Sequence, residues 1–309
     1  MKNYLIKKSK SCDVFLIGRY FSDLVFTGLP EMPRLGYEVY CKDFRLVPGG
    51  AANSAIALSR LGLNVAWPCE FGSDLFSQFV KGELIKERVD QDYFSDSENP
   101  SIHITVAFSF QNDRSFLSYM DPIRHPAHHK IIRKVHPGWI YITHLMQGNE
   151  LKEIESAARD VGARIYMDCQ AHASSLNDKN VTEALRRVDV FSPNAEEALA
   201  LTGKKKLYSA LTELAKFVPQ VIIKCGSEGC IASQAGEVIS SGAISVDVKD
   251  TTGAGDNFNC GFLFGQIKKY SFVDSLRIAN ICAGLSTRGL GGSETSPSAA
   301  ELADWFRNR

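Results

Sequence analysis

Short apolar runs alternate with longer stretches of helical periodicity along most of the chain. Residues 13–18, 139–143 and 220–224 are mainly apolar, as expected of strands that are buried on both faces of a parallel sheet. The stretches 149–161 and 194–202 instead repeat apolar positions every three to four residues. This alternation predicts an α/β fold in which helices flank a central, mostly parallel sheet.

Two segments depart from this alternation. Residues 100–121 hold two runs in which apolar and polar positions alternate, separated by a turn, which predicts an antiparallel hairpin. The stretch 36–47 is rich in aromatic and β-branched side chains and predicts one or two further strands. We therefore expect segments at about 34–47 and 100–121 to form a small antiparallel β lid, inserted in a single domain that spans residues 1–309.

Composition and charge exclude several classes of protein. Basic and acidic side chains both number 35, so no net charge favours nucleic acid or an anionic membrane as a partner. No segment approaches the roughly 20 apolar residues of a membrane span. The eight cysteines are scattered singly, with no Cys-x-x-Cys pair, which is typical of buried thiols in a reducing compartment. These features predict a cytoplasmic protein.

A glycine turn links the strand pattern of residues 246–250 to a helix that begins near residue 257. Gly253 and Gly255 let a ligand approach the backbone, and the free N–H groups of the first helical turn can bind an anion. Asp256 at this position is explained as a helix cap. Alternatively, it accepts a proton from a hydroxyl that attacks a bound phosphate. The second explanation indicates a kinase.

Polar side chains near two other predicted elements are candidates for binding a polyol. Asp23 follows the first predicted strand, where its carboxylate can accept hydroxyl hydrogens or simply cap a turn. Asn53 lies in the first turn of a helix that follows Gly49 and Gly50, which bring a ligand close to the backbone. His144 follows another buried strand, near the same sheet edge as Asp23, and is a candidate for lining a sugar pocket.

The run Asp-Thr-Thr-Gly-Ala-Gly-Asp at residues 250–256 resembles the second signature of the ribokinase-like (PfkB) carbohydrate kinases. The resemblance implies that Asp256 is the catalytic base and that Gly253, Ala254 and Gly255 form the anion hole. It also implies a ribokinase-like fold with a β lid. Two other phosphate-binding motifs are missing, because the chain has neither Gly-x4-Gly-Lys-Ser/Thr nor the third glycine of a dinucleotide fingerprint.

The substrate-side residues resemble the family with one departure. Asp23 stands five residues after Gly18, as the family's sugar-binding aspartate does. The pair Gly49 and Gly50 before Asn53 resembles the first signature, although two residues separate the second glycine from the asparagine where the family has three. Arg114 in the lid is a candidate for holding a substrate carboxylate or phosphate. The alternative for Arg114 is an ordinary solvated charge.

Further motifs match the family's nucleotide side. Asn194 and Glu197 resemble its Asn-x-x-Glu motif, which is linked to the Mg²⁺ on the nucleotide phosphates, although a capping box explains the same pair without function. The resemblance places Lys224, Gly226 and Gly229 in a loop beside the phosphates and ribose.

Two more regions match the family near the anion hole and the nucleotide. Asn280 is a candidate nucleotide contact. Asp250 and Thr252 match the region where many family members hold a monovalent cation such as K⁺.

The sequence therefore predicts an ATP-dependent kinase that transfers the γ-phosphoryl group to a hydroxyl of a small sugar. A nucleoside kinase is the alternative, because Tyr20 and Phe21 can stack against a base. A catalytically silent sugar or nucleotide sensor is the alternative from another class. The resemblance also implies a homodimer that forms through the β lid.

Overall fold

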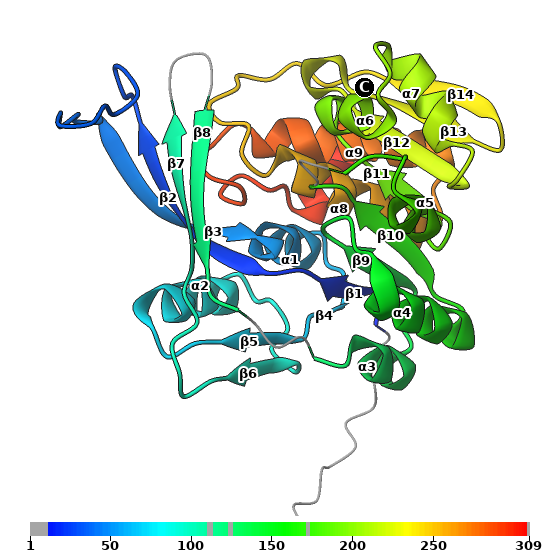
Figure 1. The fold of residues 1–309 in the computed structure, drawn as a ribbon, viewed down its shortest axis with the longest axis horizontal. Coiled ribbons are helices and arrows are strands. Elements are labelled where there is room, and N and C mark those ends of the chain that lie inside the picture. The colour runs from blue at the N-terminus through cyan, green and yellow to red at the C-terminus, as the bar shows by residue number, and fades with distance from the viewer. Residues whose placement is uncertain (1–11, 110–113, 123–125, 171–173, 308–309) are drawn as a thin grey trace, which may run out of the picture.

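The computed structural model describes residues 12–109, 114–122, 126–170 and 174–307. Its main sheet has the strand order β14-β13-β12-β11-β10-β9-β1-β4 (Figure 1). These strands are β1 (Val14–Ile17), β4 (Val65–Ala66), β9 (Trp139–Ile142), β10 (Arg164–Asp168), β11 (Val190–Ser192), β12 (Gln220–Lys224), β13 (Cys230–Gln234) and β14 (Glu237–Ser241). Neighbouring strands from β12 to β4 pair in parallel, whereas β13 pairs antiparallel with β12 and with β14.

Helices cover both faces of this sheet because its strands alternate their apolar side chains between two cores. Val14 and Leu16 of β1 belong to one core, and Phe15 and Ile17 belong to the other. The first core is covered by α1 (Ala51–Arg60), α8 (Ala254–Ile267), α9 (Phe272–Ser286) and α10 (Ala299–Arg307). The second is covered by α3 (His128–Val135), α4 (Gly148–Val161), α5 (Lys179–Leu185), α6 (Ala195–Thr202) and α7 (Leu207–Leu214).

A second sheet of four strands, which we call the lid sheet, stands at one side of the molecule (Figure 1). Its order is β3 (Asp43–Gly50), β2 (Tyr20–Thr27), β7 (His103–Ser109) and β8 (Arg114–Met120). The outer pairs are antiparallel and the central pair of β2 and β7 is parallel. Helix α2 (Leu75–Lys86) packs against this sheet, and β5 (Cys69–Phe71) pairs with β6 (Phe94–Asp96) nearby. The predicted fold class is confirmed.

The prediction of a strand at residues 36–47 was wrong for residues 36–42. Thr27, the last residue of β2, pairs with Asp43, the first residue of β3. Residues 36–42 therefore lie beyond the end of β2, where none of the described strands pairs with them. Tyr37 and Tyr40 are accordingly 71% and 77% exposed. Strand β3 instead continues through the two glycines that were expected to end it, and α1 follows directly.

Two other local expectations need correction. Asp23, expected in a loop, lies within β2 of the lid sheet. Residues 246–250, expected as a strand, form none, because the N–H groups of Lys249 and Asp250 donate to the carbonyl of Thr287 at the end of α9. The glycine turn therefore enters α8 from a loop that is attached to α9.

None of the described helices combines the length and the apolar character needed to cross a membrane. All eight cysteines are free thiols. The cytoplasmic location stays a prediction.

Candidate active site

The glycine turn is the N-terminal end of α8. Gly253 is the N-cap residue with φ +67°, a conformation that favours glycine, and a Cβ built there would overlap the backbone of Gly292. The Asn257 side-chain amide donates to the carbonyls of both glycines, at 3.0 Å each. The turn is thereby fixed against the loop at Gly292, and Asp256 lies in the first turn of the helix.

Helix α1 brings two polar side chains to the Asp256 carboxylate. Asn53 Nδ2 lies 3.5 Å from Oδ2, and Ser54 Oγ lies 3.3 Å from Oδ1. Both residues are buried in the first turn of α1, which packs against α8. Within the described part of the chain, the buried Oδ1 of Asn53 has no hydrogen-bond partner. An acceptor in that position suits a ligand hydroxyl.

Asp23 faces the same place from β2. Burial, and after it the nearby Asp256 carboxylate, raises its pKa to about 7. Gly49 makes room for this side chain, because a Cβ on Gly49 would overlap the Asp23 carboxylate. Gly50 has φ +58°, and a Cβ there would overlap the carbonyl of Arg19. The structure thus brings Asp23, Gly49, Asn53 and Asp256 together, as predicted.

The pKa of Asp256 is also raised to about 7. Burial is the largest cause and the Asp168 carboxylate adds to it, whereas Lys224 and the hydrogen bonds from Asn53 and Ser54 act in the opposite direction. A carboxyl group with a pKa near neutrality is suited to accept a proton from a hydroxyl.

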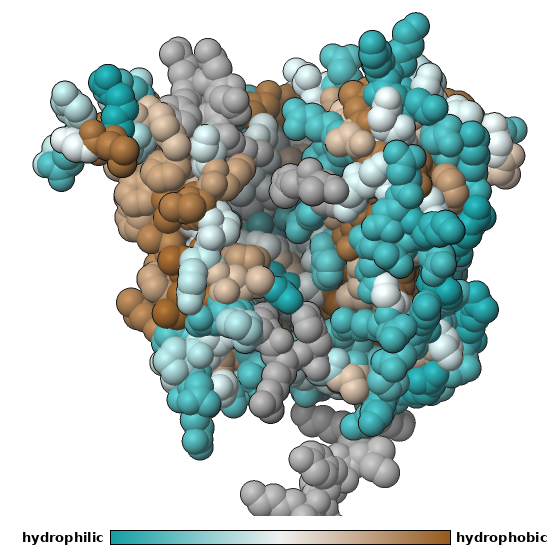
Figure 2. Space-filling view, in the orientation of Figure 1, coloured by the Kyte–Doolittle hydropathy of each residue, from teal (hydrophilic) through white to brown (hydrophobic). Residues whose placement is uncertain are grey.

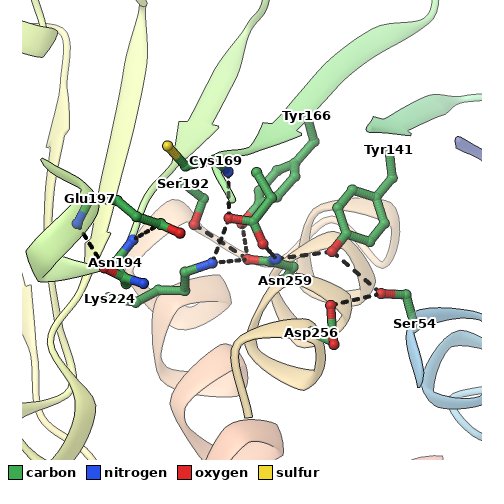
Figure 3. A network of polar contacts seen from close by, with 11 residues as sticks. Ser54, Tyr141, Tyr166, Cys169, Ser192, Asn194, Glu197, Lys224, Asp256 and Asn259 are labelled. Atoms are coloured by element: carbon green, nitrogen blue, oxygen red, sulfur yellow. Dashed lines mark hydrogen bonds and ion pairs between the residues drawn. The ribbon is translucent and has the colours of Figure 1, made fainter. Parts of the chain in front are cut away.

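A buried polar network, which the sequence did not predict, extends from this carboxylate (Figure 3). Asn259 follows Asp256 by one helical turn and donates to Tyr141 and Asp168, at 2.9 and 2.6 Å. Asp168, at the end of β10, forms an ion pair of 2.8 Å with Lys224 at the end of β12. The available signal was a polar side chain, Asn259, among the apolar residues in the middle of α8.

A cavity of about 690 Å³ lies on the other side of the glycine turn. The predicted nucleotide residues Lys224, Gly226, Gly229 and Asn280 all line it, together with Gly255 of the turn. Asn280 Nδ2 donates to the backbone and side-chain oxygens of Ser241, at 3.0 Å each. The remaining wall is largely apolar and includes Ile244, Val246, Val248 and Ala283. Its size and composition suit a nucleotide.

Asn194 and Glu197 form a capping box at the N-terminus of α6, which was the purely structural alternative for this pair. Asn194 Oδ1 accepts from the Glu197 N–H at 2.9 Å, and Glu197 Oε2 accepts from the Asn194 N–H at 2.7 Å. A backbone bridge nevertheless places Asn194 beside Lys224, and burial, followed by the Asp168 carboxylate, raises the pKa of Glu197. The described residues contain no cluster of three or more metal-binding side chains. The Glu197 carboxylate offers oxygen ligands of the kind that Mg²⁺ takes, and Mg²⁺ that keeps most of its water needs few ligands from the protein.

The Asp250 carboxylate links the glycine turn, by hydrogen bonds, to the loop that contains Gly291. Its Oδ1 accepts from the N–H and hydroxyl of Thr252, at 2.9 and 2.8 Å, and its Oδ2 accepts from the Gly291 N–H at 2.8 Å. Both predicted cation ligands thus lie next to the anion-binding turn.

The structure does not place the two other predicted substrate residues, His144 and Arg114, in this group. His144 lines a separate cavity of about 390 Å³ with Gly18 and Glu70. Arg114 begins β8, but its side chain lies outside the described residues. Their roles stay predictions.

The glycine-lined N-terminus of α8, the buried carboxylate of Asp256 and the nucleotide-sized cavity are together the features of a small-molecule phosphotransferase. The sequence matches the pfkB family carbohydrate kinase profile over residues 23–299, and the chain belongs to this family. The predicted family and the predicted carbohydrate kinase class are confirmed.

Individual relatives match along nearly the whole chain. A ribokinase of Lactococcus lactis is 29% identical over 305 residues, which cover 94% of this chain and 95% of the relative. A solved structure of Arabidopsis thaliana ribokinase with ribose and ATP is 21% identical, with a TM-score of 0.80 over 96% of this chain and 99% of that one. A double mutant of Vibrio cholerae O395 fructokinase with fructose, ADP and potassium ion is 22% identical, with a TM-score of 0.76 over 97% and 100%.

Proposed function

We propose that this kinase transfers the γ-phosphoryl group of ATP to a hydroxyl of a small sugar, with Asp256 as the base. The observation that supports it is the meeting of Asp256 from α8, Asn53 from α1 and Asp23 from β2. Asp23 and the free Oδ1 of Asn53 accept hydroxyl hydrogens and orient the sugar. Oδ2 of Asp256 then takes the proton of the attacking hydroxyl, and the backbone N–H groups of residues 253–255 stabilise the negative charge of the transferring group.

The nucleotide binds, in this proposal, in the cavity of about 690 Å³ beside the glycine turn. Lys224, Gly226, Gly229 and Asn280 contact it there. Asn194 and Glu197 would hold Mg²⁺ through water, and the ion would supply positive charge that neutralises the phosphates. A monovalent cation near Asp250 and Thr252 would stiffen the anion-binding turn, and the V. cholerae fructokinase neighbour was solved with potassium ion.

Nucleotide turnover measured with a panel of acceptors tests the function. The panel contains pentoses, hexoses, sugar acids, sugar phosphates and nucleosides, each assayed with Mg²⁺ and with either K⁺ or Na⁺ as the monovalent cation. We expect one sugar or sugar derivative to support ADP formation, and K⁺ to support it better than Na⁺. Turnover with nucleosides alone would replace the sugar proposal by a nucleoside kinase. Binding without turnover across the panel would favour a sensor.

We also propose that two copies of the chain pair through the lid sheet. The strand register places Leu24, Leu46, Val106 and Leu117 in one row on the face opposite Asp23. Helix α2 covers the near end of this face, where the Ser22 hydroxyl donates to the carbonyl of Phe76. Beyond it apolar side chains reach the surface, as Figure 2 shows at the left of the view, and Leu117 is 65% exposed. A second copy would bury this apolar face.

Replacing Leu117 by lysine is expected to convert a dimer into a monomer, because the charge would be placed at the exposed end of the apolar row, which the second copy would cover. Molar mass measured by light scattering during gel filtration checks this. Val238→Lys is the matched control, because Val238 is also exposed, at 52%, but lies on β14 at the far edge of the main sheet. A monomeric parent protein, or a Leu117→Lys variant that remains dimeric, would contradict the proposal.

A further inference from the structure

The buried network beside the base contains an amide whose orientation is fixed by its neighbours (Figure 3). Oδ1 of Asn259 faces the Lys224 ammonium at 3.4 Å and the Tyr166 hydroxyl at 2.7 Å. Nδ2 faces the Asp168 carboxylate at 2.6 Å. An ammonium only donates and a carboxylate only accepts, so the amide cannot be flipped. Its second N–H therefore points to the oxygen of Tyr141, at 2.9 Å.

The Ser54 hydroxyl has two acceptors within reach, the oxygen of Tyr141 at 3.4 Å and Oδ1 of Asp256 at 3.3 Å. The oxygen of Tyr141 already accepts an N–H of the fixed Asn259 amide. Burial raises the pKa of Tyr141 well above its ordinary value, so the phenol stays neutral and is a weaker acceptor than a carboxylate. The single proton of Ser54 is therefore directed to Oδ1 of Asp256.

We propose that Ser54 is a positioning residue for Asp256, and that the Asn259 amide, held by the ion pair of Asp168 and Lys224, keeps the oxygen of Tyr141 from competing for its proton. The hydroxyl of Ser54 occupies Oδ1 and leaves Oδ2 to face the substrate beside Asn53. The same hydrogen bond favours the ionised carboxylate, which burial disfavours. This inference rests on the proposed role of Asp256 as the base.

The pH dependence of kcat/KM reports on this hydrogen bond. The carboxyl of Asp256 is protonated and inactive below its raised pKa of about 7, so activity rises as the pH increases through that value. The titratable groups around it come from several elements and are Asp23 on β2, Tyr141 on β9, Asp168 on β10, Lys224 on β12 and Cys260 on α8. Removing the Ser54 donor leaves all of them in place.

Ser54→Ala is expected to lower kcat/KM about tenfold at pH 7 and to move the acidic limb upward by about one pH unit. Activity should recover toward that of the parent above pH 8, where the carboxylate is ionised without help. Tyr141→Phe removes only the competing acceptor, so it should leave the acidic limb in place or move it slightly downward. In the Ser54→Ala background, Tyr141→Phe should add nothing, because there is no Ser54 proton left to compete for.

Ser275→Ala is the matched control. Ser275 is also fully buried, but its hydroxyl bonds the carbonyl of Ser271 and the side chain of Gln266 at the far end of α8 and α9. Its removal should leave the acidic limb unchanged. If the parent enzyme is active, a Ser54→Ala variant with an unmoved acidic limb would overturn the positioning role. A Tyr141→Phe variant whose acidic limb moves upward as far as that of Ser54→Ala would also overturn it. Absence of turnover by the parent protein would instead refute the proposed function.

Discussion

Asp256→Asn is expected to lower kcat by about a thousandfold. The amide keeps the size of the carboxylate but cannot take a proton from the attacking hydroxyl. The sugar and nucleotide contacts lie on other residues, so dissociation constants for ADP and for the sugar should change little. Steady-state kinetics and isothermal titration calorimetry measure the two effects. Turnover within tenfold of the parent value would show that another group accepts the proton.

The same substitution should make the protein more stable above neutral pH. The pKa of Asp256 rises from 3.8 in the unfolded chain to about 7 in the folded protein. As the pH increases from 3.8 through 7, the unfolded state loses its proton first, so the free energy of unfolding falls. The asparagine does not titrate and avoids this loss. We expect its melting temperature to exceed that of the parent at pH 8 and the difference to shrink toward pH 5.

Gly49→Ala is expected to raise the KM for the sugar by about 10- to 100-fold, the value of one or two hydrogen bonds to a charged group. The added methyl group would overlap the Asp23 carboxylate. That carboxylate is at the end of a short side chain and can rotate away, so the fold should survive while the sugar loses its orienting contact. The KM for ATP should stay near the parent value, because the nucleotide cavity is lined by other elements.

Gly82→Ala provides the control for this substitution. Gly82 lies within α2, where a Cβ meets no atom within 4 Å. Alanine favours the helix more than glycine does, so this variant should be slightly more stable and kinetically unchanged. An unchanged sugar KM in Gly49→Ala would contradict the placement of Asp23 in the sugar site.

Much of the candidate site could be predicted from local sequence. Glycines predict the turn at residues 253–255, and helical periodicity predicts the helix after it. Asp256 and Asn53 lie in the first turns of their helices. Such features depend on neighbours within a few residues, so a single sequence contains them. The meeting of Asp23 with Asp256 was expected for a different reason, which was the resemblance to a known family.

The errors arose where structure depends on distant partners. Residues 36–42 have the side chains of a strand, but β-propensity forms no strand without a neighbour to pair with. Asp23 was expected to follow a strand and not to lie within one, because the partners of β2, at residues 43–50 and 103–109, lie far along the chain. The buried network joins Ser54, Tyr141, Asp168 and Lys224 to Asn259 across five elements, and no local spacing marks it.

The lid sheet carries Asp23 and Gly49, whereas Asp256, the anion-binding turn and the nucleotide cavity belong to the main body of the chain. In the proposed site, the acceptor is therefore held mainly by the lid sheet, together with Asn53 of α1, whereas the transfer chemistry lies in the main body. Changes in β2, β3, β7 and β8 can accumulate during evolution and alter which alcohol is accepted while the transfer machinery is inherited intact. This division gives a physical reason why one scaffold can diversify into enzymes for many different acceptors.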